Sequence, residues 1–237
     1  MKTYALYLES GPQRKTTMVH VLELLGCVAN GPTTEEALAR TPQAIRAYLA
    51  YLRRHGETVD PNAAFAVRVA EHVTAGDFMG RGSSSVMYPP DRAPLRPADQ
   101  KRYTAWLGWS RADLLALVKT VDPRALRAKP AGRRSLEEIL RHVLEADKDY
   151  VYSFLGPVKD VGDPANAALR GVLDLRQALE RSRAAAAARI GRLTPSERRA
   201  SRRRGRSTRT ARRTLRRMLE HEWEHRAEIA ARLGREA

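Results

Sequence analysis

The chain has 237 residues, of which 43% are hydrophobic and 30% are charged, and its formal net charge is +16. This composition is typical of a globular protein and excludes a disordered chain. No run approaches the roughly 18 consecutive apolar residues of a membrane span, and the N-terminus lacks the apolar stretch of a signal peptide. We therefore expect a cytoplasmic protein with no membrane partner. The single Cys27 excludes an intrachain disulfide.

Residues 1–73 are predicted to form a small α+β domain. Apolar and polar residues alternate in short runs, which is typical of strands, and a threonine followed by two glutamates marks the start of a helix. The elements follow the order β-β-β-α-β and are predicted at residues 4–9, at 16–24, around Val28, from Thr33 or Thr34 to Gly56, and at 65–70.

The centre of this pattern, residues 26–38, reads GCVANGPTTEEAL. This motif and the order of the elements resemble the HicB-like antitoxin family over roughly residues 2–73. The resemblance implies a sheet like that of ribonuclease H but without catalytic carboxylates. We therefore expect a small binding or dimerisation module rather than a nuclease.

The rest of the chain is predicted to be a linker and an all-α C-terminal four-helix bundle. Residues 74–99 are rich in Gly, Pro and Ser, which is typical of a linker, and residues 100–237 carry helical periodicity. The four helices are predicted from Gln100 to Asp122, from the capping box at Ser135 to Gly156, from about Asn166 to Arg192, and up to Gly234 after an arginine-rich segment. Residues 157–164 are predicted to be a loop.

Histidines on two of these helices form a candidate metal site. His221 and His225 lie one turn apart on the last helix, a spacing that suits one divalent metal but that also occurs where histidines merely complete the edge of a core. His142 lies at the margin of the apolar stripe of the second helix, so all three can converge on one ion in a bundle. Three protein ligands with an open position are typical of a catalytic metal site. Three carboxylates are placed to hydrogen-bond the imidazoles and fix their tautomers: Glu138, Glu145 and Glu228.

Two segments carry a resemblance to a known family. Residues 135–143 read SLEEILRHV and residues 221–229 read HEWEHRAEI, and together they resemble the DinB-like (YfiT-like) metal-binding bundle family over residues 100–237. The resemblance implies that His142, His221 and His225 are the metal ligands. It also implies a small-molecule substrate, because members with known activity include thiol-dependent S-transferases and a mycothiol-dependent isomerase.

The expected cofactors follow from the ligands and from the resemblance. A set of three imidazoles suits zinc, nickel or iron, so we expect one divalent transition metal. The family resemblance adds a low-molecular-weight thiol and a metal-dependent S-transferase activity. The catalytic residues beyond the metal ligands stay unknown at this point.

The pair of histidines also matches the zincin metalloprotease pattern, in which Glu222 would be the general base. Zincins need a further ligand well downstream, however, and only twelve residues follow His225. We therefore favour the bundle site over a protease.

The positive charge is concentrated in one segment. Between Arg189 and Arg217 there are 13 arginines and one acid, Glu197, and residues 198–207 read RRASRRRGRS. The alternative function is therefore a nucleic-acid-binding or antitoxin-like regulatory protein that uses this segment. Without the interleaved aromatics that stack on single strands, a solvated basic loop is favoured. The residues of the alternative site are Arg198, Arg199, Arg202, Arg203, Arg204 and Arg206.

The expected assembly is a homodimer. Both families that the chain resembles commonly dimerise, and the exposed apolar face of a small sheet usually needs to be covered.

Overall fold

The computed structural model describes residues 1–83, 85–205 and 207–235. Its internal contacts divide the chain into two compact units. The first unit contains residues 1–93 and 201–220, and the second contains residues 94–200 and the segment from His221 onward. This division rests on contacts between residues and does not test the predicted domain boundaries. The boundaries at residues 73 and 100 therefore stay a prediction.

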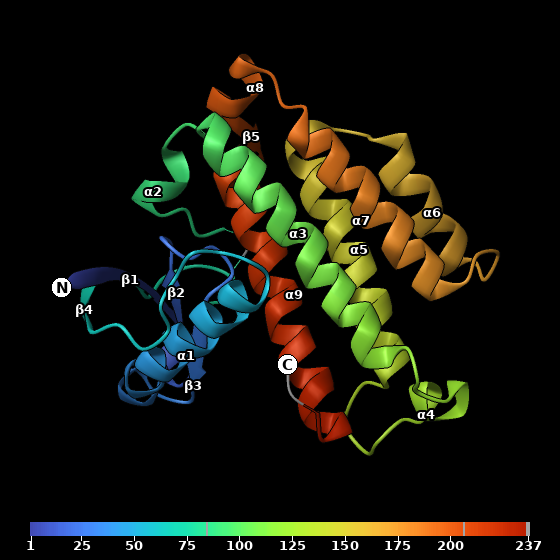
Figure 1. The fold of residues 1–237 in the computed structure, drawn as a ribbon, viewed down its shortest axis with the longest axis horizontal. Helices are drawn as coiled ribbons and strands as arrows, with labels where there is room; N and C mark the ends of the chain where they lie inside the picture. The colour runs from blue at the N-terminus through green and yellow to red at the C-terminus, as the bar shows by residue number, and fades with distance from the viewer. Residues whose placement is uncertain (84, 206, 236–237) are drawn as a thin grey trace. The chain divides into compact units, whose positions relative to one another are not determined.

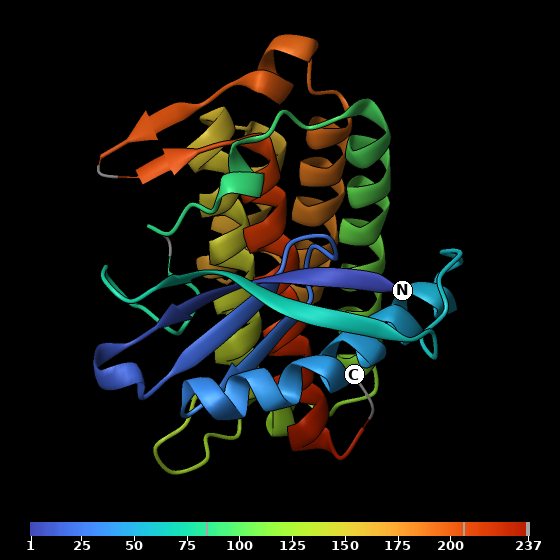
Figure 2. The same ribbon diagram turned by 90° about the vertical axis from the view of Figure 1, so that its left-hand side faces the viewer.

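The first unit contains a mixed sheet with the strand order β3-β2-β1-β4. Strand β1 pairs antiparallel with β2 and parallel with β4, and β2 pairs antiparallel with β3. Helix α1 covers one face of this sheet (Figures 1 and 2). The elements occur in the predicted order: β1 (Lys2–Ser10), the short 3-10 helix η1 (Pro12–Arg14), β2 (Thr17–Val21), β3 (Val28–Gly31), α1 (Thr34–Arg54) and β4 (Phe65–Val73).

Local chemistry fixes the ends of these elements. The side chain of Thr33 accepts a hydrogen bond from the backbone N–H of Glu36 at 3.2 Å, which caps α1. Strand β2 ends at Val21, so its predicted extension to residue 24 was wrong. A turn follows instead, in which Gly26 has a φ of +103° and a Cβ would stand 2.4 Å from the Tyr48 hydroxyl. Only glycine fits this position without strain.

The predicted linker packs onto the first unit over much of its length. Met79, Val86 and Tyr88 are buried, and helix α2 (Pro89–Arg92) follows them. The buried Glu9 carboxylate accepts hydrogen bonds from the backbone N–H groups of Gly82 and Ser83 at 2.6 and 2.8 Å. Because a buried carboxylate needs such donors, this part of the chain is held in place by hydrogen bonds as well as by apolar contact.

The arginine-rich segment contributes a hairpin and the start of a long helix to the first unit. Strand β5 (Arg202–Arg204) pairs antiparallel with β6 (Ser207–Arg209), as Figure 2 shows. Helix α9 (Ala211–Leu233) follows, and its residues up to Glu220 belong to this unit. This segment was expected to be a solvated loop. It instead forms two short paired strands, in which Arg203 and Arg204 are exposed.

A buried charge network anchors the first turns of α9 within this unit. The guanidinium group of Arg216 donates to both oxygens of Asp91 at 3.0 Å and to Glu220 at 3.2 Å. Nδ1 of His20 lies 2.8 Å from the other oxygen of Glu220. Burial alone would raise the pKa of Glu220, but the charges of His20, Arg216 and Arg217 outweigh it and lower the pKa to about 2. Glu220 is therefore a buried carboxylate with its countercharges in place.

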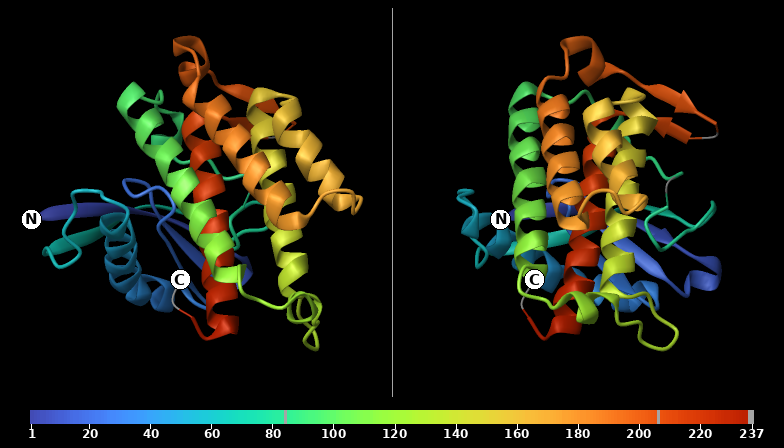
Figure 3. Two further views of the ribbon diagram at one scale, coloured as in Figure 1. Left: turned by 45° about the vertical axis from the view of Figure 1, so that its right-hand side comes forward. Right: turned by 90° about the vertical axis from the view of Figure 1, so that its right-hand side faces the viewer.

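The second unit is helical. Helices α3, α5, α6 and α7 lie side by side with roughly aligned axes (Figures 1 and 3). The residues from His221 to Leu233 of α9 complete the unit. Its helices are α3 (Pro97–Val118), α4 (Pro123–Arg127), α5 (Leu136–Leu155), α6 (Lys159–Leu169), α7 (Leu175–Gly191) and α8 (Pro195–Arg199).

The predicted third helix was wrong in its bounds. Residues 159–169 form α6, although residues 157–164 were expected to be a loop because prolines stand at both ends of that stretch. Burial of Val161, Ala165 and Ala168 outweighs the cost of Pro164 inside the helix. A turn at Gly171, with a φ of +74°, then separates α6 from α7.

The second unit has an apolar core and a closed ring of four buried charges. Leu114, Val143, Leu179 and Ile229 represent this core, which draws on α3, α5, α7 and α9. The ring takes one residue from each of the same four helices: Arg111, Asp147, Arg183 and Glu222.

Each carboxylate of this ring meets both guanidinium groups. Asp147 accepts from Arg111 at 2.8 Å and from Arg183 at 3.0 Å. One oxygen of Glu222 accepts from Arg111, and the other accepts from Arg183 at 2.6 Å. All four side chains are at least 96% buried, so the ring neutralises its charges without help from solvent.

No helix in the parts of the chain that the structure describes has the length and apolar composition to cross a membrane.

The ring gives a prediction about stability. Asp147→Asn leaves two buried guanidinium groups with one carboxylate, and we expect it to lower the free energy of unfolding by about 3–5 kcal/mol. Urea unfolding followed by circular dichroism measures this loss. The matched control is Arg141→Gln, which breaks a partly exposed pair with Glu137 and should cost less than about 1 kcal/mol. Equal losses in the two variants would contradict the importance of the ring.

Candidate metal centre

Two helices bring the three predicted histidines together. On α9, His221 and His225 are four residues apart and so lie on the same face, one turn from each other. On α5, the capping box fixes the start of the helix: Ser135 accepts from the backbone of Glu138 at 3.1 Å, and Glu138 accepts from the backbone of Ser135 at 2.7 Å. His142 follows two turns later and meets the α9 pair.

The three imidazoles form a compact cluster. Nε2 of His142 lies 3.0 Å from Nε2 of His221. One nitrogen from each of the three rings can be chosen so that all three lie within 4.8 Å of one another. The rings meet edge to face, with centroids 4.6–5.1 Å apart. His221 is 9% exposed and the other two are half-buried, so the cluster remains partly open to solvent.

The surroundings favour the neutral form of the rings. Burial lowers the pKa of His142, and the positive charge of Arg134 lowers it further. Burial also lowers the pKa of His225, against the opposing effect of its hydrogen bond to Glu228. A histidine binds a metal through an unprotonated nitrogen, so both shifts favour the form that a ligand must have.

Of the three predicted carboxylates, the structure brings Glu228 to the cluster. Its Oε2 lies 3.0 Å from Nδ1 of His225, and since a carboxylate accepts here, Nδ1 carries the hydrogen and Nε2 keeps its lone pair. Glu138 is instead used by the capping box and by an ion pair with Lys129 at 2.7 Å. Glu145 is exposed, and it raises the pKa of His142 through its charge without a hydrogen bond to the triad among the described residues.

The nitrogens of His142 and His221 have the spacing of two ligands of one transition-metal ion. Nitrogen ligands lie about 2.0–2.1 Å from zinc, so two neighbouring ligand nitrogens are about 2.9–3.4 Å apart for angles from 90° to tetrahedral. The observed 3.0 Å between His142 and His221 falls within this range. Within the described parts of the chain, no cysteine, aspartate, glutamate or further histidine belongs to the cluster.

Glu222, the general base of the zincin alternative, has a different role. Its two oxygens accept from Arg111 and Arg183 in the buried ring, and the side chain is 1% exposed. Burial alone would raise the pKa of Glu222, but the charges of the two guanidinium groups outweigh this effect and hold the pKa below its ordinary value. A carboxylate held in this way is unsuited to accept a proton from a substrate, which argues against a protease.

A pocket that the sequence did not reveal adjoins the cluster. It has a volume of about 590 Å³ and is hereafter the arginine pocket. Glu228 lines the pocket and also contacts His225, so this one side chain connects the pocket with the triad. A run of arginines immediately before the helix of His142 was the signal that could have pointed to it. Its lining residues are Gly132, Arg133, Arg134, Glu228, Ala231 and Arg232.

The described arginines of the alternative nucleic-acid site lie in α8 and in strand β5. Arg198 donates to the side chain of Gln100 at 3.1 Å, and Arg203 donates to the carbonyl of Gly205 at 3.2 Å. Arg199 and Arg204 are exposed and Arg202 is half-buried, whereas Arg206 lies outside the described residues. Binding of nucleic acid by this segment stays a prediction.

One of three comparisons with known proteins gave a match. The model of the DinB superfamily matches residues 107–229, which is more than half of the chain and includes all three histidines. Neither the curated proteins nor the solved structures gave a match. The resemblance of residues 2–73 to the HicB-like antitoxins stays a prediction.

The geometry of the site predicts that Glu228 and Glu145 contribute differently to metal affinity. Glu228→Ala removes the acceptor of the His225 Nδ1 hydrogen, and we expect it to weaken metal binding by about 10–100-fold. Competition with a chromophoric chelator measures the affinity. Glu145→Ala is the matched control, and it should leave the affinity within about twofold, because its carboxylate makes no hydrogen bond to the triad among the described residues. Equal effects of the two substitutions would rule out the special role of Glu228.

Proposed function

Since the chain belongs to the DinB superfamily, we propose that it binds one divalent transition metal through His142, His221 and His225 and acts on a small molecule there. The observation that carries this proposal is the convergence of three imidazole nitrogens, from two helices, within 4.8 Å of one another. Zinc, nickel and iron all suit such a donor set.

The proposed activity is that of a metal-dependent transferase that works through a small-molecule thiol. A bound divalent cation would lower the pKa of such a thiol and so favour the thiolate, which is the nucleophilic form. The chain's own thiol is unsuited to this task. Cys27 is 1% exposed, and burial raises its pKa, so it stays a thiol. The nucleophile is therefore an external molecule.

The residues of the site have separate tasks in this proposal. Burial lowers the pKa of His142 and His225 and so favours the neutral rings, which can donate a lone pair. Glu228 fixes the tautomer of His225 through its hydrogen bond. Three protein ligands leave coordination positions for a substrate, which distinguishes a catalytic site from a structural one.

We further propose that residues 1–73 are a HicB-like accessory module and that the protein is a homodimer. In support, β4 is an edge strand of the sheet, and its Val67 and Val69 are 38% and 44% exposed. An edge strand with exposed apolar side chains is a surface that proteins usually cover. Light scattering over a wide concentration range is expected to give twice the chain mass, and a monomer throughout would refute the dimer.

The proposed function predicts a spectroscopic signal. With cobalt in place of the native metal, a small thiol is expected to produce a sulfur-to-metal charge-transfer absorption, because thiolates are good ligands of such ions. His221→Ala should abolish the band together with stoichiometric metal binding. The control is Arg170→Gln, an exposed substitution after α6 that should leave the band unchanged. A cobalt-loaded protein that shows no band with any low-molecular-weight thiol would refute the thiol-transfer proposal.

A further inference from the structure

We propose that the arginine pocket is a binding site for a small anionic molecule, which Arg133 and Arg134 hold by its carboxylate or phosphate group beside the histidine triad. The inference rests on the proposed function, since it names the substrate class of the same site. Its own support comes from the charges, contacts and size of the pocket.

The charges of the pocket are unbalanced. Three arginines and one acid line it. Arg232 is satisfied, because its guanidinium group donates to Glu228 at 2.8 Å and to the carbonyl of Arg134 at 2.6 Å. The side chains of Arg133 and Arg134 form no hydrogen bond or ion pair with any residue that the structure describes. Two positive charges thus line a concave surface without a countercharge.

This arrangement suits a particular kind of ligand. A guanidinium group presents paired N–H donors that match the two oxygens of a carboxylate or phosphate. A concave site lined by one sign of charge also raises the local concentration of ligands of the opposite sign. The volume of about 590 Å³ lies within the range of small-molecule sites.

A single carboxylate joins the pocket to the triad. Glu228 accepts from Arg232 through Oε1, on the side of the pocket, and contacts His225 through Oε2. The field of Arg134 also reaches the triad: after burial, this charge is a further cause that lowers the pKa of both His142 and His225. A molecule held by Arg133 and Arg134 therefore has its remaining part within reach of the histidines.

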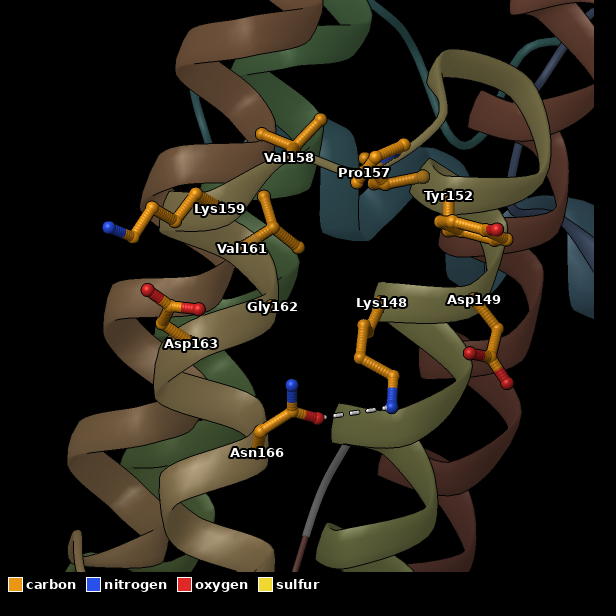
Figure 4. Close-up of a pocket in the computed structure, with 11 residues that line it drawn as sticks. Lys148, Asp149, Tyr152, Pro157, Val158, Lys159, Val161, Gly162, Asp163 and Asn166 are labelled. Carbon is orange, nitrogen blue, oxygen red and sulfur yellow. Dashed lines mark hydrogen bonds between the residues drawn. The ribbon is translucent and has the colours of Figure 1, made fainter.

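A second cavity serves as a comparison. It lies between α5 and α6, has a volume of about 380 Å³ and is lined by residues that include Lys148, Lys159, Asp149 and Asp163 (Figure 4). Its lining contains two lysines and two acids, and Lys148 donates to Asn166 at 3.4 Å. Its lining includes no residue of the triad. The excess of positive charge beside the histidines is therefore a property of the arginine pocket rather than of every cavity in this basic chain.

The test is calorimetric titration of the full-length protein with defined probes. Succinate and inorganic phosphate represent the two anion classes, and succinamide is the neutral control. Each probe is titrated into the metal-free and the zinc-loaded protein. We expect saturable binding of at least one anion, no binding of succinamide, and a loss of affinity of at least about tenfold in the Arg133→Gln/Arg134→Gln double variant, which loses two charged donors. The anion that binds more tightly identifies the class.

Two controls make the result specific. Arg127→Gln removes an exposed arginine of α4 that does not line the pocket, and it should change the anion affinity by less than about twofold. The double variant should still bind one zinc ion per chain, since neither arginine is a metal ligand. Circular dichroism confirms that the variants are folded.

The outcomes separate the inference from the proposed function. Failure of both anions to bind, equal binding by the double variant, or an equal loss in Arg127→Gln would overturn the anion site. Anion binding that behaves as expected in a protein unable to hold zinc would leave the pocket in place and refute the metal-dependent function instead.

Discussion

The second unit depends on the buried ring formed by Arg111, Asp147, Arg183 and Glu222. A buried charge without a partner costs several kcal/mol, so each of the four helices is stable only in the register that completes the ring. The same register positions the histidines, because His221 precedes Glu222 directly and Asp147 follows the α5 histidine by little more than one turn. Pairing of charges in the core and convergence of imidazoles at its edge are thus consequences of one arrangement.

Three consecutive residues of α9 have three different sets of partners. Glu220 accepts from Arg216 and contacts His20, while His221 joins the imidazole cluster and Glu222 closes the ring. Successive side chains on a helix point about 100° apart, so such a division is what helical geometry allows. An acidic residue therefore stands on each side of a candidate metal ligand, and its carboxylate has partners other than the imidazole cluster. Both acids neutralise buried cations.

The sequence predicted the parts of the site that depend on local spacing. His221 and His225 share a helix face because of their separation alone, and the contact of Glu228 with His225 follows from the same periodicity. Glu138 shows the limit of this reasoning, since the capping box that correctly located α5 also uses its carboxylate. Contacts between helices carry no such local signature, so neither the ring nor the arginine pocket was predicted. Helix α6 was missed because burial overrode its proline.

The net charge of the chain says little about where an anion could bind until the partners of each arginine are known. Arg111 and Arg183 form ion pairs with buried carboxylates, and Arg216 forms ion pairs with Asp91 and Glu220. These residues stabilise the fold and present no charge to a ligand. Arg133 and Arg134, which stand outside the dense basic segment, line a cavity and form no ion pair with a described residue. In the anion site proposed above, recognition therefore depends on two arginines that form no ion pair with a described residue and that line a pocket adjoining the histidines.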